Sequence, residues 1–362
     1  MTMNQNNFQI RENIKLAPLT TFRVGGPARY FIEASNEETV QQALVWAKER
    51  GLPLFILGGG SNIIVADGGF KGLVVQIALK GIDEEIQNGR AIITAAAGED
   101  WDAFVAWCVE RDFAGFECLS GIPGFVGGTP VQNVGAYGQE VSETIVSVRA
   151  LDRKSANVVE ISNEACGFSY RHSIFNTTER ESYVVLSVTY ALTPHAGPAL
   201  RYADVQRYFA GYNAAPTLKE VRNAVCEIRA RKSMVISPDD PNSQSAGSFF
   251  KNPIISEKEF VEVEERAKSL GVVGPCETVP RYPAGEGQAK IPAAWLIERA
   301  GFYKGYVRGP AGLSTNHTLA IINRGGATAK DILVLMREIQ TTVEEKFSVQ
   351  LKPEPVFVGF EE

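Results

Sequence analysis

The order of strand-like and helix-like segments predicts an α+β fold that is divided into more than one domain. Near the N-terminus an amphipathic segment, 37–50, lies between two apolar segments, 29–35 and 53–57, which is the pattern of a βαβ unit. Strand-like segments with polar turns fill the middle of the chain, and helix-capping sequences mark its last third. The chain has 362 residues, whereas single domains commonly have about 100–150, so several domains are expected.

The segments that follow the βαβ unit predict another strand and another helix. The segment 91–98, AIITAAAG, has the small and β-branched residues of a buried strand. In the segment 100–112 the apolar residues Trp101, Phe104, Val105 and Cys108 recur at helical spacing, so they share one face of a predicted helix.

The middle of the chain predicts a second, β-rich layer. Segments 146–152, 157–162 and 183–192 are strand-like and are separated by polar turns. The next segment, 195–216, contains Pro, Gly and Tyr residues typical of a long loop. A helix is predicted directly after it, because Thr217 and Glu220 form a T-x-x-E capping box.

The last third of the chain predicts a separate α+β domain that contains several helices. The segment 236–247, ISPDDPNSQSAG, is typical of a linker. Ser256 and Glu259 form another capping box, and the segment 328–347 carries apolar residues at helical spacing. These residues are Ile332, Leu335, Met336, Ile339 and Val343. The final apolar segment, 355–360, has no neighbouring strand in the sequence, so we expect it to return to an earlier sheet.

The composition argues against several classes of function. The 36 Lys and Arg residues are outnumbered by 42 Asp and Glu residues, and no long basic block occurs, so no nucleic-acid partner is expected. The chain lacks a signal-peptide pattern and an apolar run of about 18 residues, so we expect a cytoplasmic protein without a membrane span. The five Cys residues form no C-x-x-C pair and the three His residues lie in no metal-binding motif, so neither a disulfide framework nor a metal site is expected.

An uncharged, glycine-rich run from Ser120 to Gly138 is the strongest functional signal in the sequence. Glycine lets backbone N–H groups approach a ligand closely, and successive N–H groups can bind a diphosphate. A second glycine segment, Gly58 to Asn62, ends the strand-like segment 53–57, and two such loops suit one dinucleotide. Neither segment has the Rossmann or the Walker pattern, and the alternative that glycine-rich segments form only turns remains.

Three polar residues lie in apolar or rigid surroundings and are candidates for catalysis. Arg171 offers paired donors for a carboxylate, Ser248 offers one exchangeable proton, and Glu354 is a carboxyl group held between two prolines. Together these groups could protonate a carbanion and stabilise its carboxylate. Each also has a structural alternative: an ion pair for Arg171, a turn hydroxyl for Ser248 and a solvated charge at the end of a strand for Glu354.

Six successive segments resemble the motifs of UDP-N-acetylenolpyruvoylglucosamine reductases, the flavoenzymes that complete UDP-N-acetylmuramate for peptidoglycan. The segments are TTFRVGGPARY, ILGGGSN, GIPGFVGGTPVQNVGAYG, SYRHSIF, AGSFFKNP and KPEP, and the match is colinear from about Pro18 to Gly359. The resemblance implies an FAD-binding fold of the vanillyl-alcohol oxidase and p-cresol methylhydroxylase type, with two subdomains, plus a C-terminal α+β substrate-binding domain. The implied parts are residues 1–79 with 347–362, residues 80–232, and residues 233–346.

The resemblance also implies a cofactor site built from the two glycine segments. The sequence has no obvious cysteine or histidine attachment signal, so FAD is expected to bind there without a covalent link. The implied cofactor-binding residues are Gly58, Gly59, Gly60, Ser61, Asn62, Ser120, Ile122, Pro123, Gly124, Gly127, Gly128, Thr129, Gln132, Asn133, Gly135, Ala136 and Tyr137.

The same resemblance implies roles for the three catalytic candidates. NADPH would reduce the flavin and leave, after which hydride would pass to C3 of the enolpyruvyl group of the UDP-sugar substrate. Arg171 and Glu354 would stabilise the negative charge that develops at C2 and its carboxylate, and Ser248 would give the proton to C2. Tyr202 matches a mobile-loop tyrosine that covers the substrate in one group of these reductases; Lys232 matches a diphosphate-binding lysine, and Asn252 a further substrate contact.

Two other functions stay open from the sequence, and one position departs from the family. A flavin oxidase of the same fold would pass electrons to oxygen, and a non-catalytic nucleotide-binding sensor would need only the glycine loops. The family often has a basic residue two positions after the catalytic glutamate, where this chain has Val356, which puts one flavin contact in doubt. We expect a monomer whose partners are small molecules, namely the UDP-sugar and NADPH.

Overall fold

The computed structural model describes residues 8–274 and 277–360, and within them the chain forms two compact units. Unit 1 consists of Met1–Lys15, Pro27–Gly60 and Phe70–Val235, and unit 2 consists of Leu16–Gly26, Ser61–Gly69 and Ile236–Glu362. The chain therefore passes from unit 1 to unit 2 and back twice before residue 70. The division into three parts at residues 79, 232 and 346 stays a prediction.

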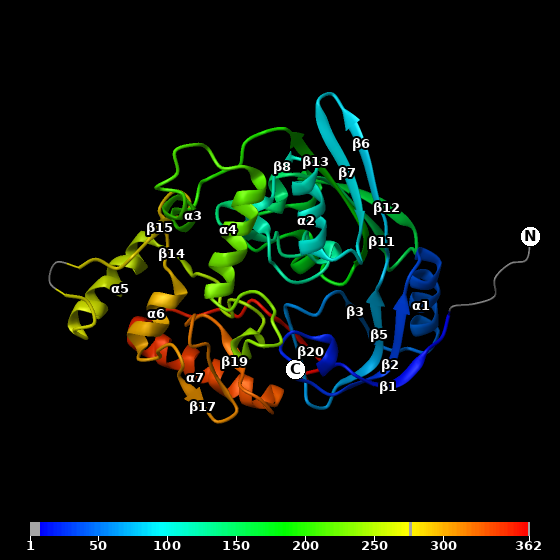
Figure 1. The fold of residues 1–362 in the computed structure, drawn as a ribbon. Helices are drawn as coiled ribbons and strands as arrows, with labels where there is room; N and C mark the ends of the chain where they lie inside the picture. Colours follow the sequence, from blue (N-terminus) through cyan, green and yellow to red (C-terminus); the bar gives the residue numbers. More distant parts are fainter. Residues whose placement is uncertain (1–7, 275–276, 361–362) are drawn as a thin grey trace, which may run out of the picture. The chain divides into compact units, whose positions relative to one another are not determined.

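The first sheet of unit 1 contains the predicted βαβ unit (Figure 1). Its strand order is β1 (Arg11–Lys15), β2 (Pro27–Ala34), β5 (Phe70–Ile77) and β3 (Leu54–Leu57), and β2, β5 and β3 run parallel. Helix α1 (Glu37–Glu49) connects β2 to β3 and begins at Asn36, whose side chain accepts a hydrogen bond from Thr39 N. The apolar face of α1 is buried with the sheet. The C-terminal end of β3 leads directly into Gly58, the first residue of the shorter glycine segment.

The second sheet of unit 1 is antiparallel and has the order β12-β11-β13-β7-β6. The strands are β6 (Ile82–Gln87), β7 (Arg90–Ala96), β11 (Ile145–Asp152), β12 (Val158–Ser162) and β13 (Tyr183–Pro194), and the short β8 (Phe113–Ala114) pairs with β13. Helix α2 (Trp101–Glu110) buries the predicted face, with Trp101 1% exposed. Strand β6 was not predicted, because its sequence, IDEEIQ, is mostly polar and exposed at the sheet edge.

The segment between β13 and the linker contains one helix that the sequence predicted and one that it did not. Helix α4 (Leu218–Arg231) begins with the predicted capping box of Thr217 and Glu220. The predicted long loop 195–216 is wrong in part, because it contains the short helix α3 (Ala203–Tyr208). Val205 and Phe209 pack with the buried face of α4, and this tertiary contact stabilises a helix that is too short to show periodicity.

Unit 2 has an α+β core in which α5 (Glu257–Ser269), α6 (Ala293–Ala300) and α7 (Ala329–Phe347) accompany small sheets. The sheets are β14 (Ile254–Ser256), β16 (Gln288–Lys290) and β15 (Tyr282–Pro283), and β17 (Val307–Arg308), β18 (Ala311–Leu313) and β19 (Ile321–Asn323). The predicted apolar face of α7 is buried, and the predicted capping box of Ser256 is present. The C-terminal strand β20 (Val356–Val358) pairs in parallel with β4 (Ile63–Val65), so the expected return to an early strand is confirmed.

The predicted linker 236–247 is an ordered part of unit 2 instead of a loose connection. Ser243 is 6% exposed, and its hydroxyl oxygen lies 2.8 Å from each of the carbonyl oxygens of Ser237 and Asp240, within hydrogen-bond distance of both. Asn323 N, in β19, donates to Gln244 O over 2.9 Å. The polar residues that suggested a linker therefore satisfy one another and the neighbouring strand.

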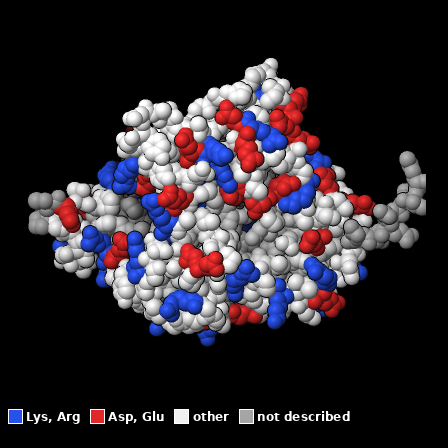
Figure 2. All heavy atoms as spheres, viewed as in Figure 1, with Lys and Arg blue, Asp and Glu red and all other residues white. Residues whose placement is uncertain are grey.

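The surface carries interspersed charges on the face seen in Figure 2, where acidic and basic side chains alternate without a large single-sign patch. In residues 8–274 and 277–360 no helix has both the length and the apolarity needed to cross a bilayer. Cys108, Cys118, Cys166 and Cys226 are free thiols, and Cys276 lies outside the described residues.

Candidate cofactor and substrate site

The two predicted glycine loops lie against each other in unit 1. An ideal Cβ on Gly59 would lie 2.8 Å from Cα and 3.1 Å from C of Gly124, closer than side-chain atoms approach a backbone. These residues come from the end of β3 and from the segment after α2, so the contact exists only in the folded chain. Glycine at both positions therefore makes a joint backbone surface of the kind that can bind a diphosphate.

Neighbouring glycines in these loops differ in what surrounds them. A Cβ on Gly58 or on Gly128 would meet no protein atom within 4 Å, whereas a Cβ on Gly127 would lie 2.6 Å from Cβ of Ala97. Gly127 is thus needed for packing within the protein. Gly58 and Gly128 face outward from the protein atoms, which fits a surface that a bound dinucleotide would cover.

Asp102 and Arg229 hold the backbone at the start of the long glycine run. Gly121 N donates to Asp102 Oδ1 over 2.5 Å, and Arg229 Nε donates to Gly121 O over 3.1 Å. Arg222 donates to both oxygens of Asp102 over 2.5 and 2.9 Å. Burial acts to raise the pKa of Asp102, but the hydrogen bonds from Arg222 and Gly121 outweigh it, so the pKa lies below 3.8.

Sequence reasoning missed this clamp of Asp102, Arg222 and Arg229. A signal was available, because Asp102 is a carboxylate within the apolar sequence WDAFVAW. Arg222 and Arg229 are seven positions apart in α4, so they lie on one helix face. Which backbone group they reach depends on the packing of α2 and α4, which the sequence does not show.

Three predicted cofactor residues turn their side chains into the protein. Ser120 Oγ donates to Glu117 O over 2.6 Å, and Thr129 Oγ1 lies 2.9 Å from the Tyr190 hydroxyl. Asn133 is fully buried, and its Nδ2 donates to Glu140 Oε2 over 2.7 Å and to Ser169 O over 3.1 Å. These side chains stabilise the loop through contacts inside the protein. If the three residues bind the cofactor, they do so through their backbone groups.

Arg171 is tied to the glycine run through the hairpin of β9 (Gly135–Ala136) and β10 (Gln139–Glu140). Its Nη2 donates to Gly135 O over 2.8 Å, and its backbone has a left-handed φ of 56°. Asn176 Nδ2 donates to Arg171 O over 3.2 Å from the capped turn that begins at Ser173. A left-handed φ is uncommon for a residue other than glycine, and it is held here by contacts on both sides.

The predicted substrate residues Tyr202 and Lys232 meet Tyr137 in unit 1. The rings of Tyr137 and Tyr202 pack edge to face at 5.5 Å, and Lys232 Nζ lies 5.8 Å from the centre of the Tyr137 ring. Lys232 Nζ also donates to Asp204 Oδ2 over 2.8 Å; burial acts to lower the pKa of Lys232, but this bond outweighs it and raises the pKa. A cavity of about 350 Å³ lies beside the cluster, lined by Asp204, Arg207, Tyr208, Ile228, Arg231 and Lys232.

Ser248 and Glu354 lie on neighbouring segments of unit 2. Glu354 N donates to Phe249 O over 2.8 Å, and Lys251 N donates to Lys352 O over 3.0 Å, so the two segments run antiparallel. Phe249 and Phe250, which belong to the segment of Ser248, are buried. The backbone thus brings together two catalytic candidates that are more than a hundred residues apart in sequence.

Ser61 and Asn62, predicted as cofactor residues, lie beside the Glu354 segment in unit 2. Asn62 Nδ2 donates to Glu354 O over 3.3 Å, and Val356 N donates to Asn62 O over 2.9 Å. Thr21 Oγ1 lies within hydrogen-bond distance of both Ser61 O, at 3.3 Å, and Ser245 O, at 2.5 Å. Thr21 belongs to the first of the matched motifs, and its contacts hold the segments of Asn62 and Ser248 in place.

Asn252 has a structural role that the sequence did not reveal. Its Oδ1 accepts a hydrogen bond from Ala293 N over 2.9 Å, at the start of α6. The carbonyl end of this amide thus caps a helix, and its Nδ2 is the end that can donate to a substrate oxygen.

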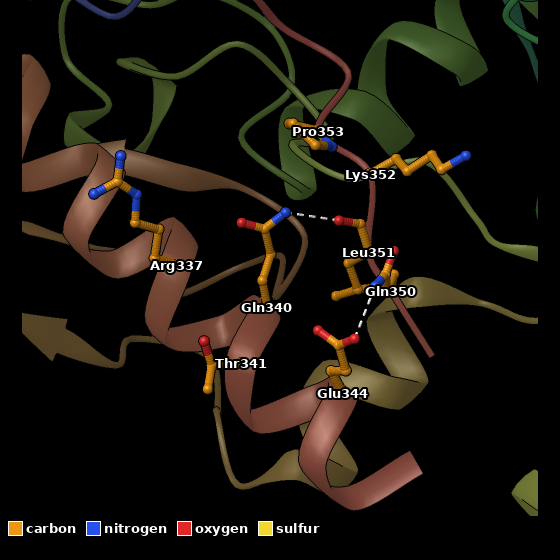
Figure 3. A pocket seen from close by; sticks show the side chains of 8 residues that line it. All are labelled: Arg337, Gln340, Thr341, Glu344, Gln350, Leu351, Lys352 and Pro353. Carbon is orange, nitrogen blue, oxygen red and sulfur yellow. Dashed lines mark hydrogen bonds between the residues drawn. The ribbon is translucent and has the colours of Figure 1, made fainter. Parts of the chain in front are cut away.

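A second cavity, of about 370 Å³, lies in unit 2 between α7 and the segment that leads to Glu354 (Figure 3). Gln340 Nε2 donates to Leu351 O over 2.7 Å, and Gln350 Nε2 donates to Glu344 Oε1 over 2.8 Å. The amide groups at this cavity therefore fix the approach to Pro353 and hence the course of the chain into Glu354.

Comparisons with known proteins agree with this arrangement. Residues 28–162 match an FAD binding domain, and residues 239–358 match the C-terminal domain of UDP-N-acetylenolpyruvoylglucosamine reductase. The UDP-N-acetylenolpyruvoylglucosamine reductase of Streptomyces coelicolor is 48% identical over 95% of this chain and 89% of its own length. The enzyme of the same name from Thermobifida fusca is 45% identical over 96% of this chain and 97% of its own length.

A solved structure shows that the fold is shared as well. The UDP-N-acetylenolpyruvylglucosamine reductase of Thermus caldophilus superposes with a TM-score of 0.64, at 24% identity, over 97% of this chain and all of that one. The predicted fold class, an FAD-binding fold of the vanillyl-alcohol oxidase and p-cresol methylhydroxylase type with a C-terminal α+β domain, is confirmed. With relatives at this identity along nearly its whole length, the chain belongs to the UDP-N-acetylenolpyruvoylglucosamine reductase family.

Proposed function

We propose that this protein reduces the enolpyruvyl group of UDP-N-acetylglucosamine enolpyruvate to give UDP-N-acetylmuramate, using NADPH and noncovalently bound FAD. The observation that carries the proposal is that the chain combines an FAD binding domain with the C-terminal domain of these reductases. The paired glycine loops, where a Cβ on Gly59 would strike Gly124, supply the backbone surface that such a cofactor needs. The reaction belongs to peptidoglycan precursor synthesis, and the cytoplasm and a monomer are the predicted setting.

In the proposed mechanism the protein side chains stabilise the negative charge that develops on the substrate and donate the proton that it takes up. When bound, the flavin supplies the hydride for C3, which it has taken from NADPH. Arg171 offers a planar guanidinium to the substrate carboxylate, and its bond to Gly135 O fixes the direction of that group. Glu354 stabilises the enol-like charge, and its backbone is fixed by Phe249 and Asn62.

Ser248 is the proposed donor of the proton to C2. It follows Gly247, whose φ of 71° turns the chain sharply, and it precedes the buried Phe249. A hydroxyl group donates a proton effectively only when it is placed within hydrogen-bond distance of the receiving atom. The antiparallel contact between the segments of Ser248 and Glu354 supports a common action on one enolpyruvyl group.

The cluster of Tyr137, Tyr202 and Lys232 is the proposed site for the diphosphate and sugar. Its cavity carries the cationic groups of Arg207, Arg231 and Lys232, which complement a diphosphate within a protein of net charge −6. Lys232 is held by Asp204, so binding of the diphosphate exchanges one anionic partner for another.

An anaerobic two-step titration tests the function. The purified protein should be yellow, lose its flavin absorbance on addition of NADPH, and regain it on addition of the enolpyruvyl UDP-sugar. Recovery with oxygen alone would support the oxidase, and a protein that binds the UDP-sugar without any flavin reduction would support the sensor. Either result would overturn the proposed reaction.

Replacement of Ser248 tests the assignment of the proton donor. Ser248→Ala should leave the rate of flavin reduction by NADPH unchanged and slow reoxidation by the UDP-sugar by about 10²- to 10⁴-fold, the usual contribution of a general acid. Stopped-flow absorbance measures both half-reactions. If both rates fall equally, Ser248 serves folding or cofactor binding instead.

A further inference from the structure

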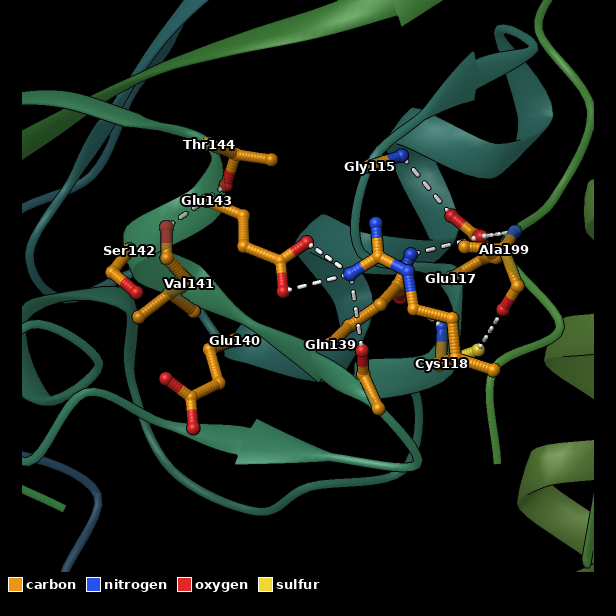
Figure 4. Close-up of polar contacts among 12 residues, drawn as sticks. Gly115, Glu117, Cys118, Gln139, Glu140, Val141, Ser142, Glu143, Thr144 and Ala199 are labelled. Carbon is orange, nitrogen blue, oxygen red and sulfur yellow. Dashed lines mark hydrogen bonds and ion pairs between the residues drawn. The ribbon is translucent and has the colours of Figure 1, made fainter. Parts of the chain in front are cut away.

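Glu117 is a carboxylate buried in the core of unit 1, where it is only 1% exposed (Figure 4). Its Oε2 accepts a hydrogen bond from Gly115 N over 3.0 Å, and its Oε1 accepts from Gln139 Nε2 over 3.0 Å and from Ala199 N over 2.9 Å. A buried charge is costly unless several donors surround it, and here three donors do so, one from two residues away and two from distant segments.

Glu117 and Gln139 connect the two ends of the glycine run. Glu117 begins the 3₁₀ helix Glu117–Leu119, which directly precedes Ser120, and Gln139 directly follows Gly138. Gln139 is 3% exposed, and its Oε1 accepts a hydrogen bond from Cys118 N over 2.8 Å. The pair therefore closes the run of 120–138 into a loop of fixed width.

Through Gln139 the carboxylate also supports the segment that carries Arg171. Gln139 pairs with Ala136 in the hairpin of β9 and β10, and Gly135 of that hairpin accepts the bond from Arg171 Nη2. Asn133 extends the support, because its Nδ2 reaches both Glu140 Oε2 and Ser169 O.

Through Ala199 the same carboxylate anchors the segment that leads to Tyr202. Ala199 N is bound by Glu117, and the Cys118 thiol donates to Ala199 O over 3.5 Å. The next anchor along this segment is Arg201, whose Nη1 donates to the Glu143 carboxylate over 2.8 and 3.0 Å. That ion pair is exposed, with 59% and 40% of the two side chains accessible, so it contributes little.

We propose that Glu117 is a positioning residue that fixes the Tyr202 segment and the Arg171 hairpin relative to the glycine run. The proposal rests on the proposed function, in which Tyr202 covers the substrate and Arg171 binds its carboxylate. One carboxylate then sets the geometry on both sides of the substrate.

Two variants distinguish the contact of Glu117 with the Tyr202 segment from its contact with Gln139 and the Arg171 hairpin. Glu117→Gln keeps the shape but replaces one acceptor oxygen by an NH₂ group, so donors from Gln139, Ala199 and Gly115 compete for a single oxygen. Ala199→Pro removes only the N–H of the Tyr202 branch and leaves Glu117 bound to Gln139. Glu143→Gln is the matched control, because it removes the exposed ion pair of the same segment.

The first measurement is independent of activity. Hydrogen exchange of the amides in 197–204 should be at least about tenfold faster in Glu117→Gln than in the wild type, which corresponds to about 1.4 kcal/mol of lost protection. Amides of β13 should exchange at the wild-type rate. This comparison holds whether or not the wild type reduces the UDP-sugar, so failure of the proposed function and failure of this inference are distinguishable.

The second measurement separates the two half-reactions. Ala199→Pro should raise the Kd of UDP-N-acetylmuramate by at least about tenfold, which is measured from the change that this ligand causes in the flavin spectrum. The rates of flavin reduction by NADPH and of reoxidation at saturating UDP-sugar should equal those of the wild type. Glu117→Gln should raise the Kd similarly and also slow reoxidation, and Glu143→Gln should change the Kd by less than about threefold. Equal loss of both half-reactions in Ala199→Pro, or unchanged exchange in Glu117→Gln together with an unchanged Kd in the two test variants, would overturn the inference.

Discussion

Replacement of Gly128 by valine is predicted to weaken the binding of FAD while leaving the free energy of unfolding of the apoprotein nearly unchanged. A Cβ on Gly128 would meet no protein atom within 4 Å, and its φ lies outside the left-handed region, so the substitution is compatible with the folded chain. If the glycine run binds FAD through its backbone, the branched side chain would lie between the backbone and the cofactor.

The expected magnitudes differ between binding and folding. Forcing extra methyl groups into a packed contact costs about 1–3 kcal/mol, which raises the Kd of FAD by about 5- to 150-fold. The free energy of unfolding of the apoprotein should change by less than about 0.5 kcal/mol, as is usual for an exposed position. Gly127→Ala is the contrasting variant, because its Cβ would lie 2.6 Å from Cβ of Ala97, and overpacking of this kind should destabilise the apoprotein by about 1–3 kcal/mol.

Urea unfolding of the two apoproteins and titration with FAD measure these quantities. FAD content after gel filtration, read from the flavin absorbance, gives a second measure of affinity. A Gly128→Val protein that binds FAD with the wild-type Kd would refute the placement of the cofactor on this loop. Unfolding of that apoprotein at markedly lower urea would show that Gly128 is needed for packing instead.

Three further predictions concern single side chains. Asp102→Asn should lower the free energy of unfolding at pH 7 by about 1.5–3 kcal/mol. Folding depresses the pKa of Asp102 below its ordinary value of 3.8. The difference in stability between the wild type and the variant should therefore be full above about pH 4 and disappear as the pH falls through the pKa of the folded protein. Burial raises the pKa of Cys118 to about 12, so mass spectrometry should find this thiol unmodified after treatment of the folded protein with a disulfide reagent at about pH 8. Lys232→Met should raise the KM for the UDP-sugar by about tenfold or more in steady-state assays while reduction by NADPH stays at the wild-type rate.

The fold was predictable where the local pattern and the tertiary structure favour the same element. Helix α7 shows this, since its apolar residues at helical spacing are those that the structure buries. Strand β6 and helix α3 were not predictable, because β6 is a polar edge strand and α3 is a short helix that depends on its contact with α4. Neither the alternation typical of a strand nor the spacing typical of a helix is clear enough in these two short segments to predict the element.

For the site, the sequence by itself determined which residue types are present: two glycine segments, an arginine, a serine and a glutamate in motifs that resemble one enzyme family. Motifs are local, so each could be recognised without knowing where the chain returns. Only the tertiary structure decided that Gly59 touches Gly124, that the segments of Ser248 and Glu354 run side by side, and that Asn133 turns inward. It also decided the role of Glu117: besides the nearby Gly115 N, the donors Gln139 Nε2 and Ala199 N come from distant segments, and their meeting depends on packing that no short stretch of sequence encodes.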